Sequence, residues 1–141
     1  MAFNERTIRD LTAAQSRMDL WVGFIRAVGV RRMAEVGVYR GEFAEVLLKT
    51  SRDIERYYMI DPWRHLDDWN KPANTTNSIF EGFLIETKQR TEFAVNKRIV
   101  PRGKTTEVAR GIRDEELDFC YIDGDHTLKG ITIDLWRCYP R

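Results

Sequence analysis

The stretch MAEVGVYRGEF at residues 33–43 decides the fold. Its apolar start is typical of a buried strand, and Glu35, Gly37 and Gly41 follow before a helical pattern begins. Glycine adopts backbone conformations closed to other residues, and the N–H groups that open a helix point outward toward a ligand. A strand, a glycine turn and a helix in this order predict a loop that binds a nucleotide-like cofactor.

The spacing of the acid and the glycines distinguishes between cofactors. Dinucleotide loops follow G-x-G-x-x-G, whereas this chain reads Glu-x-Gly-x-x-x-Gly from Glu35 to Gly41. A carboxylate before the first glycine suits a ligand with a positive end, such as an amino-acid ammonium, and is poorly placed to face a pyrophosphate. Glu35 could instead pair with Arg31 or Arg32, but in this glycine setting we expect it to contact the ligand, directly or through water.

The hydrophobic pattern predicts alternating strands and helices, which favour one parallel sheet covered on both faces. The expected strands are residues 31–37, 54–60, 99–101 and 117–122, and the expected helices are residues 4–28, 42–48 and 79–95. We expect residues 1–30 to form an N-terminal helical cap and residues 31–141 to form the cofactor-binding domain, with an α/β, Rossmann-like fold.

Three segments of the chain resemble class I S-adenosylmethionine-dependent methyltransferases: residues 35–41, YYMIDPW at 57–63 and LDFCYIDGDH at 117–126. The motifs IDPW at 60–63 and YIDGDH at 121–126 most resemble those of a small-molecule O-methyltransferase subgroup. This subgroup includes macrocin O-methyltransferase-like and cephalosporin-hydroxylase-like proteins. The resemblance spans roughly residues 20–139. It implies S-adenosylmethionine as the cofactor and transfer of its methyl group to a hydroxyl, or less often an amine, of a small molecule.

The resemblance also implies which residues surround the cofactor. Beside Glu35, the loop residues Gly37, Val38, Tyr39 and Gly41 would line it.

Residues after the next two strands complete this set. Asp61 ends the second strand, and a carboxylate there can accept both ribose hydroxyls; a turn or helix-cap aspartate is the alternative. Trp63 could stack on the adenine or pack as a structural side chain, and Thr105 would lie near the adenine.

Asp123, Asp125 and His126 form the densest polar cluster and follow the fourth strand, at the end of a parallel strand where ligands bind. Asp123 could contact the cofactor or ligate a divalent cation such as Mg²⁺, which prefers carboxylate oxygens. Asp125 is expected to cap the helix that starts at Thr127. His126 is the candidate general base, because an imidazole ordinarily titrates near neutral pH; a structural role at the helix start is the alternative.

The composition of the chain limits the classes of binding partner and the cellular compartment that we expect. The chain has 141 residues, with 23 basic and 22 acidic residues interspersed, so it carries no electrostatic footprint for nucleic acid or an anionic membrane. No apolar stretch approaches the roughly 20 residues of a membrane span. Cys120 and Cys138 have no metal-ligand spacing, which indicates reduced thiols in a cytoplasmic protein.

The sequence ends soon after the helix that follows the fourth strand, whereas the resembling family continues with further strands. We therefore expect this chain to lack the C-terminal strands of the full methyltransferase fold and to leave the fourth strand on an edge. Either the chain is truncated, or a second copy of the chain covers the exposed edge of the fourth strand. Two rivals to a methyltransferase remain: a non-catalytic nucleotide-binding or assembly module with a degenerate fold, and a metal-dependent hydroxylase-like relative.

Overall fold

The computed structural model describes residues 4–141. Its parallel sheet holds β1 (Arg32–Val36), β2 (Arg56–Ile60), β3 (Arg98–Ile99) and β4 (Phe119–Ile122) in the order β3-β2-β1-β4. The first strand in the chain is thus central, paired with β2 on one side and with β4 on the other. The predicted α/β, Rossmann-like fold is confirmed.

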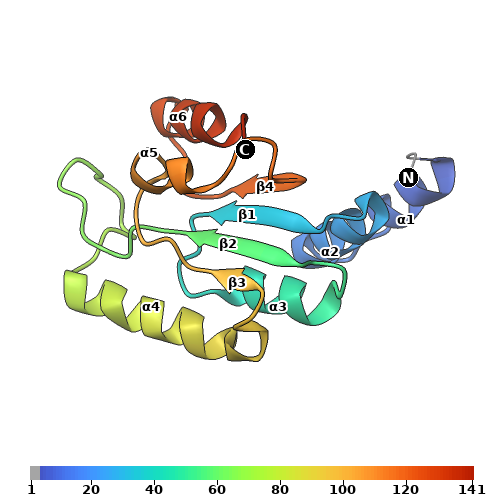
Figure 1. The fold of residues 1–141 in the computed structure, drawn as a ribbon, viewed down its shortest axis with the longest axis horizontal. Coiled ribbons are helices and arrows are strands. Elements are labelled where there is room, and N and C mark those ends of the chain that lie inside the picture. The colour runs from blue at the N-terminus through green and yellow to red at the C-terminus, as the bar shows by residue number, and fades with distance from the viewer. Residues whose placement is uncertain (1–3) are drawn as a thin grey trace.

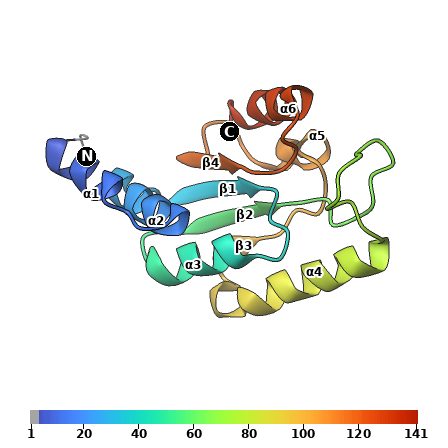
Figure 2. The ribbon, with the colours of Figure 1, turned by 180° about the vertical axis from the view of Figure 1, so that it is seen from behind.

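Helices cover both faces of this sheet (Figure 1). On one side lie α2, α3 and α4, and on the other lie α5 and α6, with α1 projecting from the end of the molecule (Figures 1 and 2). The helices are α1 (Glu5–Thr12), α2 (Arg17–Val28), α3 (Glu42–Thr50), α4 (Asn77–Arg90), α5 (Thr105–Val108) and α6 (Leu128–Cys138), with short 3₁₀ turns η1 (Glu92–Ala94) and η2 (Ala109–Gly111).

Alternation along the strands builds two apolar layers. Met33, Tyr57 and Met59 point into the layer beneath α2, α3 and α4, whereas Ala34 and Tyr58 point into the layer shared with α6. This is the period of two that a strand imposes on its side chains. Both faces of β1 and β2 are therefore buried, which fixes the ends of these strands in place.

The N-terminal segment differs from the predicted single helix over residues 4–28. It forms α1 and α2, because the side chain of Ser16 accepts a hydrogen bond from the Asp19 N–H and starts a new helix. The predicted stop at Gly29 is confirmed, since this residue ends α2 in the left-handed conformation.

Two other elements are shorter than predicted. The expected helix over residues 79–95 ends at Arg90, and a 3₁₀ turn follows. The third strand holds only Arg98 and Ile99 and stops before Pro101, which has no N–H to donate to a ladder.

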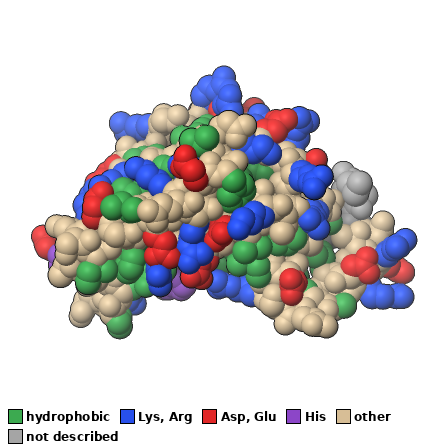
Figure 3. All heavy atoms as spheres, turned by 90° about the horizontal axis from the view of Figure 1, so that it is seen from below, with side chains coloured by type: hydrophobic (Ala, Val, Ile, Leu, Met, Phe, Trp, Pro, Cys, Tyr) green, Lys and Arg blue, Asp and Glu red, His purple; other side chains and the backbone are tan. Residues whose placement is uncertain are grey.

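The surface mixes charges of both signs. Figure 3 shows acidic and basic side chains interspersed on one face of the molecule. Arg90 illustrates the pattern: its guanidinium lies 2.8 Å from carboxylate oxygens of both Glu45 and Glu86, which ties α3 to α4. Across residues 4–141, no helix combines the length and the apolar composition that a membrane span requires.

Candidate functional site

Three carboxyl groups meet at the carboxyl end of the sheet, where ligands bind in folds of this class. Glu35 lies near the end of β1, Asp61 directly follows β2, and Asp123 directly follows β4. Because β2 and β4 flank β1 in parallel register, the three side chains come from neighbouring strand ends. In Figure 1 the arrowheads of these strands point toward the end where the loop between β2 and α4 projects.

Glu35 is a buried acid, with only 2% of its surface exposed. The Tyr57 hydroxyl donates to Glu35 Oε2 at 2.8 Å. The pKa of Glu35 is raised to about 8, chiefly by burial; the Tyr57 hydrogen bond opposes this rise, and the charges of Asp61 and Asp123 add to it.

The arginines that could have neutralised Glu35 bind other acids. Arg31 pairs with Glu55, and Arg32 lies 3.1 Å from Asp118. The salt-bridge interpretation of Glu35 is therefore wrong. Its contact with a ligand remains a prediction.

Asp61 holds the glycine loop in shape. Its Oδ2 accepts from the N–H groups of Val38 and Tyr39, both at 3.0 Å, and its Oδ1 accepts from the Trp63 N–H at 2.8 Å. A carboxylate has about four acceptor positions, so about one remains for a ligand hydroxyl. The structure thus shows the turn role for Asp61, and the contact with both ribose hydroxyls remains a prediction that requires one of these bonds to be exchanged.

Gly37 and Gly41 both adopt positive φ angles, of 88° and 78°. A Cβ atom at Gly37 would lie 2.5 Å from the Asp123 carbonyl oxygen and 2.6 Å from the Gly124 Cα. Only glycine therefore lets the loop after β1 pack directly on the loop after β4. Gly41 is the residue that precedes α3, so its left-handed conformation turns the chain into the helix.

Tyr39 lies between these glycines and has a positive φ of 56°. Its half-exposed ring packs on Phe83 of α4, with 4.7 Å between ring centroids. Its carbonyl accepts from the Trp63 indole, so the loop is tied to the chain after β2 on two sides.

Trp63 and Thr105 are both buried and hydrogen-bonded within the protein. Trp63 is fully buried, and its Nε1 donates to the Tyr39 carbonyl at 2.8 Å, so neither ring face is open to an adenine. The buried Thr105 hydroxyl donates to Asp134 at 2.6 Å. Contact of either residue with a cofactor remains a prediction. Asp134 was not among the predicted residues, although a lone acid amid the apolar positions of α6 is a signal of a buried polar contact.

Asp123 lies between a histidine and an arginine. His126 Nε2 is 3.2 Å from Asp123 Oδ1, and Arg17 Nη2, from the first turn of α2, is 3.5 Å from Asp123 Oδ2. The His126 side chain is 70% exposed, so it extends from the sheet edge toward solvent. Arg17 was missed because no local pattern links α2 to the end of β4.

The remaining acid of this loop is structural. Asp125 accepts from both the N–H and the hydroxyl of Thr127, each at 3.0 Å. Thr127 itself caps α6 by accepting from the Gly130 N–H. The predicted capping role of Asp125 is therefore corrected: Asp125 orients the residue that forms the cap.

A metal site at Asp123 is not assembled in the part of the chain that the structure describes. No group of three or more His, Cys, Asp or Glu side chains within residues 4–141 is placed to hold a metal ion. Asp123 has His126 as its neighbour on one side, but the guanidinium of Arg17 approaches its other oxygen. That positive group competes for the position where a cation would bind.

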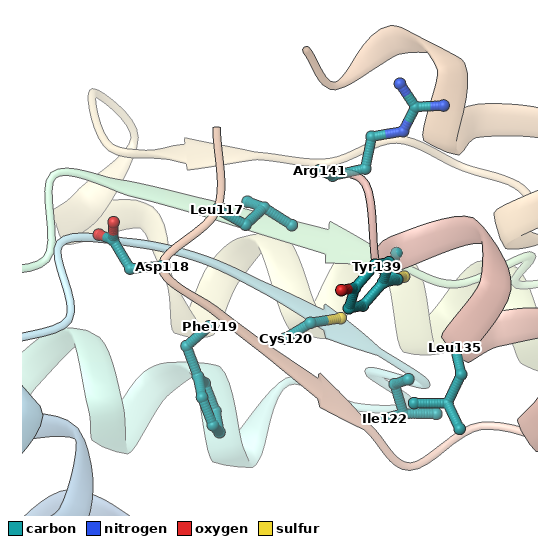
Figure 4. A pocket seen from close by; sticks show the side chains of 9 residues that line it. Leu117, Asp118, Phe119, Cys120, Ile122, Leu135, Tyr139 and Arg141 are labelled. Atoms are coloured by element: carbon teal, nitrogen blue, oxygen red, sulfur yellow. The ribbon is translucent and has the colours of Figure 1, made fainter. Parts of the chain in front are cut away.

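Two cavities of the described residues lie away from these acids. One, of about 240 Å³, follows the outer edge of β4 beneath α6 (Figure 4) and is lined by Leu117, Asp118, Phe119, Cys120, Ile122, Leu135, Cys138, Tyr139 and Arg141. Another, of about 300 Å³, lies between α1 and α2. Neither is lined by the three carboxyl groups. The prediction that the fourth strand forms a sheet edge is confirmed.

Replacing Asp61 by alanine is expected to lower the free energy of unfolding by roughly 1–3 kcal/mol, because three backbone N–H groups would lose their acceptor. Urea denaturation measures the change. Asp67→Ala is the matched control in the following loop, where the carboxylate is fully exposed, and should change stability by less than about 0.5 kcal/mol. Equal effects of the two variants would contradict the role given to Asp61.

Solved structures share the fold. A protein from Staphylococcus aureus proposed to be a caffeoyl-CoA O-methyltransferase superposes with a TM-score of 0.62 at 18% identity, over 96% of this chain and 58% of that one. A methyltransferase from Geobacter sulfurreducens gives 0.60 at 14% identity, over 99% and 67%. The O-methyltransferase TomG from Streptomyces achromogenes gives 0.55 at 17% identity, over 96% and 61%. This chain therefore spans about three fifths of the length of such proteins.

The family of the chain follows from a comparison of its sequence with known proteins and protein families. No curated protein matches the chain. Residues 34–141, however, match the family model described as a methyltransferase domain. This match begins within β1 and runs through the glycine loop, Asp61 and the loop after β4. The chain belongs to the methyltransferase-domain family.

Proposed function

We propose that this domain binds S-adenosylmethionine at the carboxyl ends of β1, β2 and β4 and serves methyl transfer to a hydroxyl of a small molecule. The observation that carries the proposal is the convergence of Glu35, Asp61 and Asp123 beside the glycine loop. Three acids, two of which (Glu35 and Asp61) are buried without an ion pair among residues 4–141, suit a ligand with positive groups. S-adenosylmethionine carries two, an ammonium and a sulfonium, so the residues present fit this cofactor.

The similar structures support the same cofactor. The TomG structure is a complex with S-adenosylmethionine, and an O-methyltransferase structure from Bacillus cereus is a complex with its demethylated product. The latter superposes on this chain with a TM-score of 0.54.

S-adenosylmethionine supplies a methyl carbon already activated by the sulfonium, so positioning the acceptor accounts for most of the catalysis. Glu35 would face the ammonium, and Asp61 would hold the loop against the cofactor. His126, next to Asp123, would take the proton from the acceptor hydroxyl.

Calorimetry tests this proposal against its rivals. S-adenosylmethionine or its demethylated product is expected to bind at least about tenfold more tightly than NAD, because a charge-assisted hydrogen bond contributes about 1.5–3 kcal/mol. Tighter binding of NAD would overturn the proposal. Cofactor binding without methyl transfer to any of a panel of hydroxylated acceptors would favour a non-catalytic binding module.

A further inference from the structure

The side chains that affect the ionisation of the Glu35 carboxyl group are a hydroxyl and two acids. Tyr57 on β2 donates to it, and Asp61 and Asp123 lie close enough to affect its ionisation. Tyr121 of β4 is the other titratable group that faces it, with its ring stacked on Phe43 of α3 at 4.4 Å.

No basic side chain within residues 4–141 forms an ion pair with Glu35. The nearest candidates on its own strand segment, Arg31 and Arg32, pair with other acids. Arg17 reaches this end of the sheet, but it approaches Asp123.

An ionised carboxylate in such a place is costly, because burial removes its hydration and two further acids repel it. The neutral form avoids both costs and keeps the Tyr57 hydrogen bond. A pKa of about 8 agrees with this geometry. At neutral pH the ligand-free protein therefore holds Glu35 predominantly protonated.

A ligand that brings a positive group to this edge of the sheet favours the ionised form of Glu35 over the neutral form. The cation supplies the counter-charge that the protein lacks, so the carboxylate becomes the favoured form. We propose that Glu35 is protonated in the ligand-free protein and releases its proton to solvent when a cationic ligand binds, which makes ligand charge a determinant of specificity. This inference rests on the proposed cofactor only for the identity of the ligand.

The direction of the pH dependence follows by linkage. Because the free protein binds one more proton than the complex, affinity rises with pH, by about tenfold per unit below the Glu35 pKa of about 8, as long as the ligand keeps its positive charge. A neutral ligand of the same shape would show no such dependence.

Calorimetry in buffers of different ionisation enthalpy counts the protons exchanged. At about pH 6.5, where an α-amino group with an ordinary pKa is already protonated, S-adenosylmethionine is expected to release about one proton from the wild-type protein. Glu35→Gln has nearly the same volume but no proton to lose, so its binding enthalpy should not depend on the buffer.

Glu116→Gln is the matched control. Glu116 is also buried and also accepts from a tyrosine hydroxyl, that of Tyr58. However, Arg56 and Arg113 pair with it and, together with the Tyr58 hydrogen bond, lower its pKa to about 2, so it is already ionised. This variant should release the same number of protons as the wild type.

The outcomes separate the inference from the proposed cofactor. Binding without buffer dependence would overturn the inference and leave the cofactor in place. Absence of binding by S-adenosylmethionine and its demethylated product would overturn the cofactor. In that case, NMR of the free protein with ¹³C-labelled glutamate carboxyls decides the inference.

A carboxyl that titrates near the Glu35 pKa of about 8, and that is missing from Glu35→Gln, would support the inference. Titration of every glutamate below about pH 5 would overturn it.

Discussion

Replacing His126 by alanine should lower the rate of methyl transfer by roughly 10²–10⁴-fold, the usual contribution of a positioned general base. Cofactor affinity should be nearly unchanged, because the imidazole is 70% exposed. Its ring nitrogen lies 3.2 Å from Asp123, which can orient the base toward an acceptor. Steady-state kinetics with an acceptor found in a panel of hydroxylated molecules measures the loss.

His65→Ala is the control for this experiment. The other histidine of the chain lies in the loop after β2, where its Nδ1 lies 3.0 Å from the Thr75 carbonyl oxygen. Its removal should leave turnover unchanged. The deficit of His126→Ala should also shrink at high pH, where the acceptor ionises unaided. Normal turnover together with reduced thermal stability would instead make His126 a structural residue at the start of α6.

Gly37→Ala should lower the free energy of unfolding by roughly 2–5 kcal/mol, since a positive φ costs about 1–2 kcal/mol with a side chain and overpacking costs about 1–3 kcal/mol more. The added methyl would lie 2.5 Å from the Asp123 carbonyl oxygen, an atom of rigid backbone. The loops after β1 and β4 would be forced apart, and cofactor binding should be lost with them. Chemical denaturation and calorimetry measure the two effects.

Alanine substitutions at two other glycines separate the cost of a positive φ from the cost of overpacking. Gly29 has a φ of 75° with nothing within 4 Å of the added Cβ, so Gly29→Ala reports the conformational cost alone, about 1–2 kcal/mol. At Gly124 the nearest atom to the Cβ is an ordinary 3.5 Å away, so Gly124→Ala should change stability by less than about 0.5 kcal/mol. If Gly37→Ala costs no more than Gly29→Ala, direct packing of the two loops is unimportant.

The strands of the sheet could be predicted because each is marked by a short apolar run in the sequence, which can be recognised without knowing its neighbours in space. The segments around Met33, Tyr57 and Cys120 are apolar runs bounded by polar turns, and each forms a strand. Glu35, Asp61 and Asp123 could be placed together from sequence, since acids that follow neighbouring parallel strands must meet at one edge.

The sequence could not show how deeply each side chain is buried or which groups it binds. Trp63 and Thr105 occupy the expected positions, yet their polar atoms bind within the protein, which depends on burial rather than on residue type. Asp61 was correctly placed, but its three backbone donors come from a loop whose φ angles no pattern reveals. The ion pair of Arg17 with Asp123 joins distant parts of the chain, so no local pattern predicts it.

The position of β1 in the sheet has a consequence for synthesis. Of the four described strands, β1 emerges first and its neighbour β4 emerges last: Arg32 and Asp118, which are hydrogen-bonded at the start of these strands, are 86 residues apart. Until β4 leaves the ribosome, one side of β1 presents unpaired backbone to other chains. Closing so long a loop is slow compared with forming a helix. The backbone groups of β1 that face β4 therefore stay unpaired throughout the interval between synthesis of the two strands.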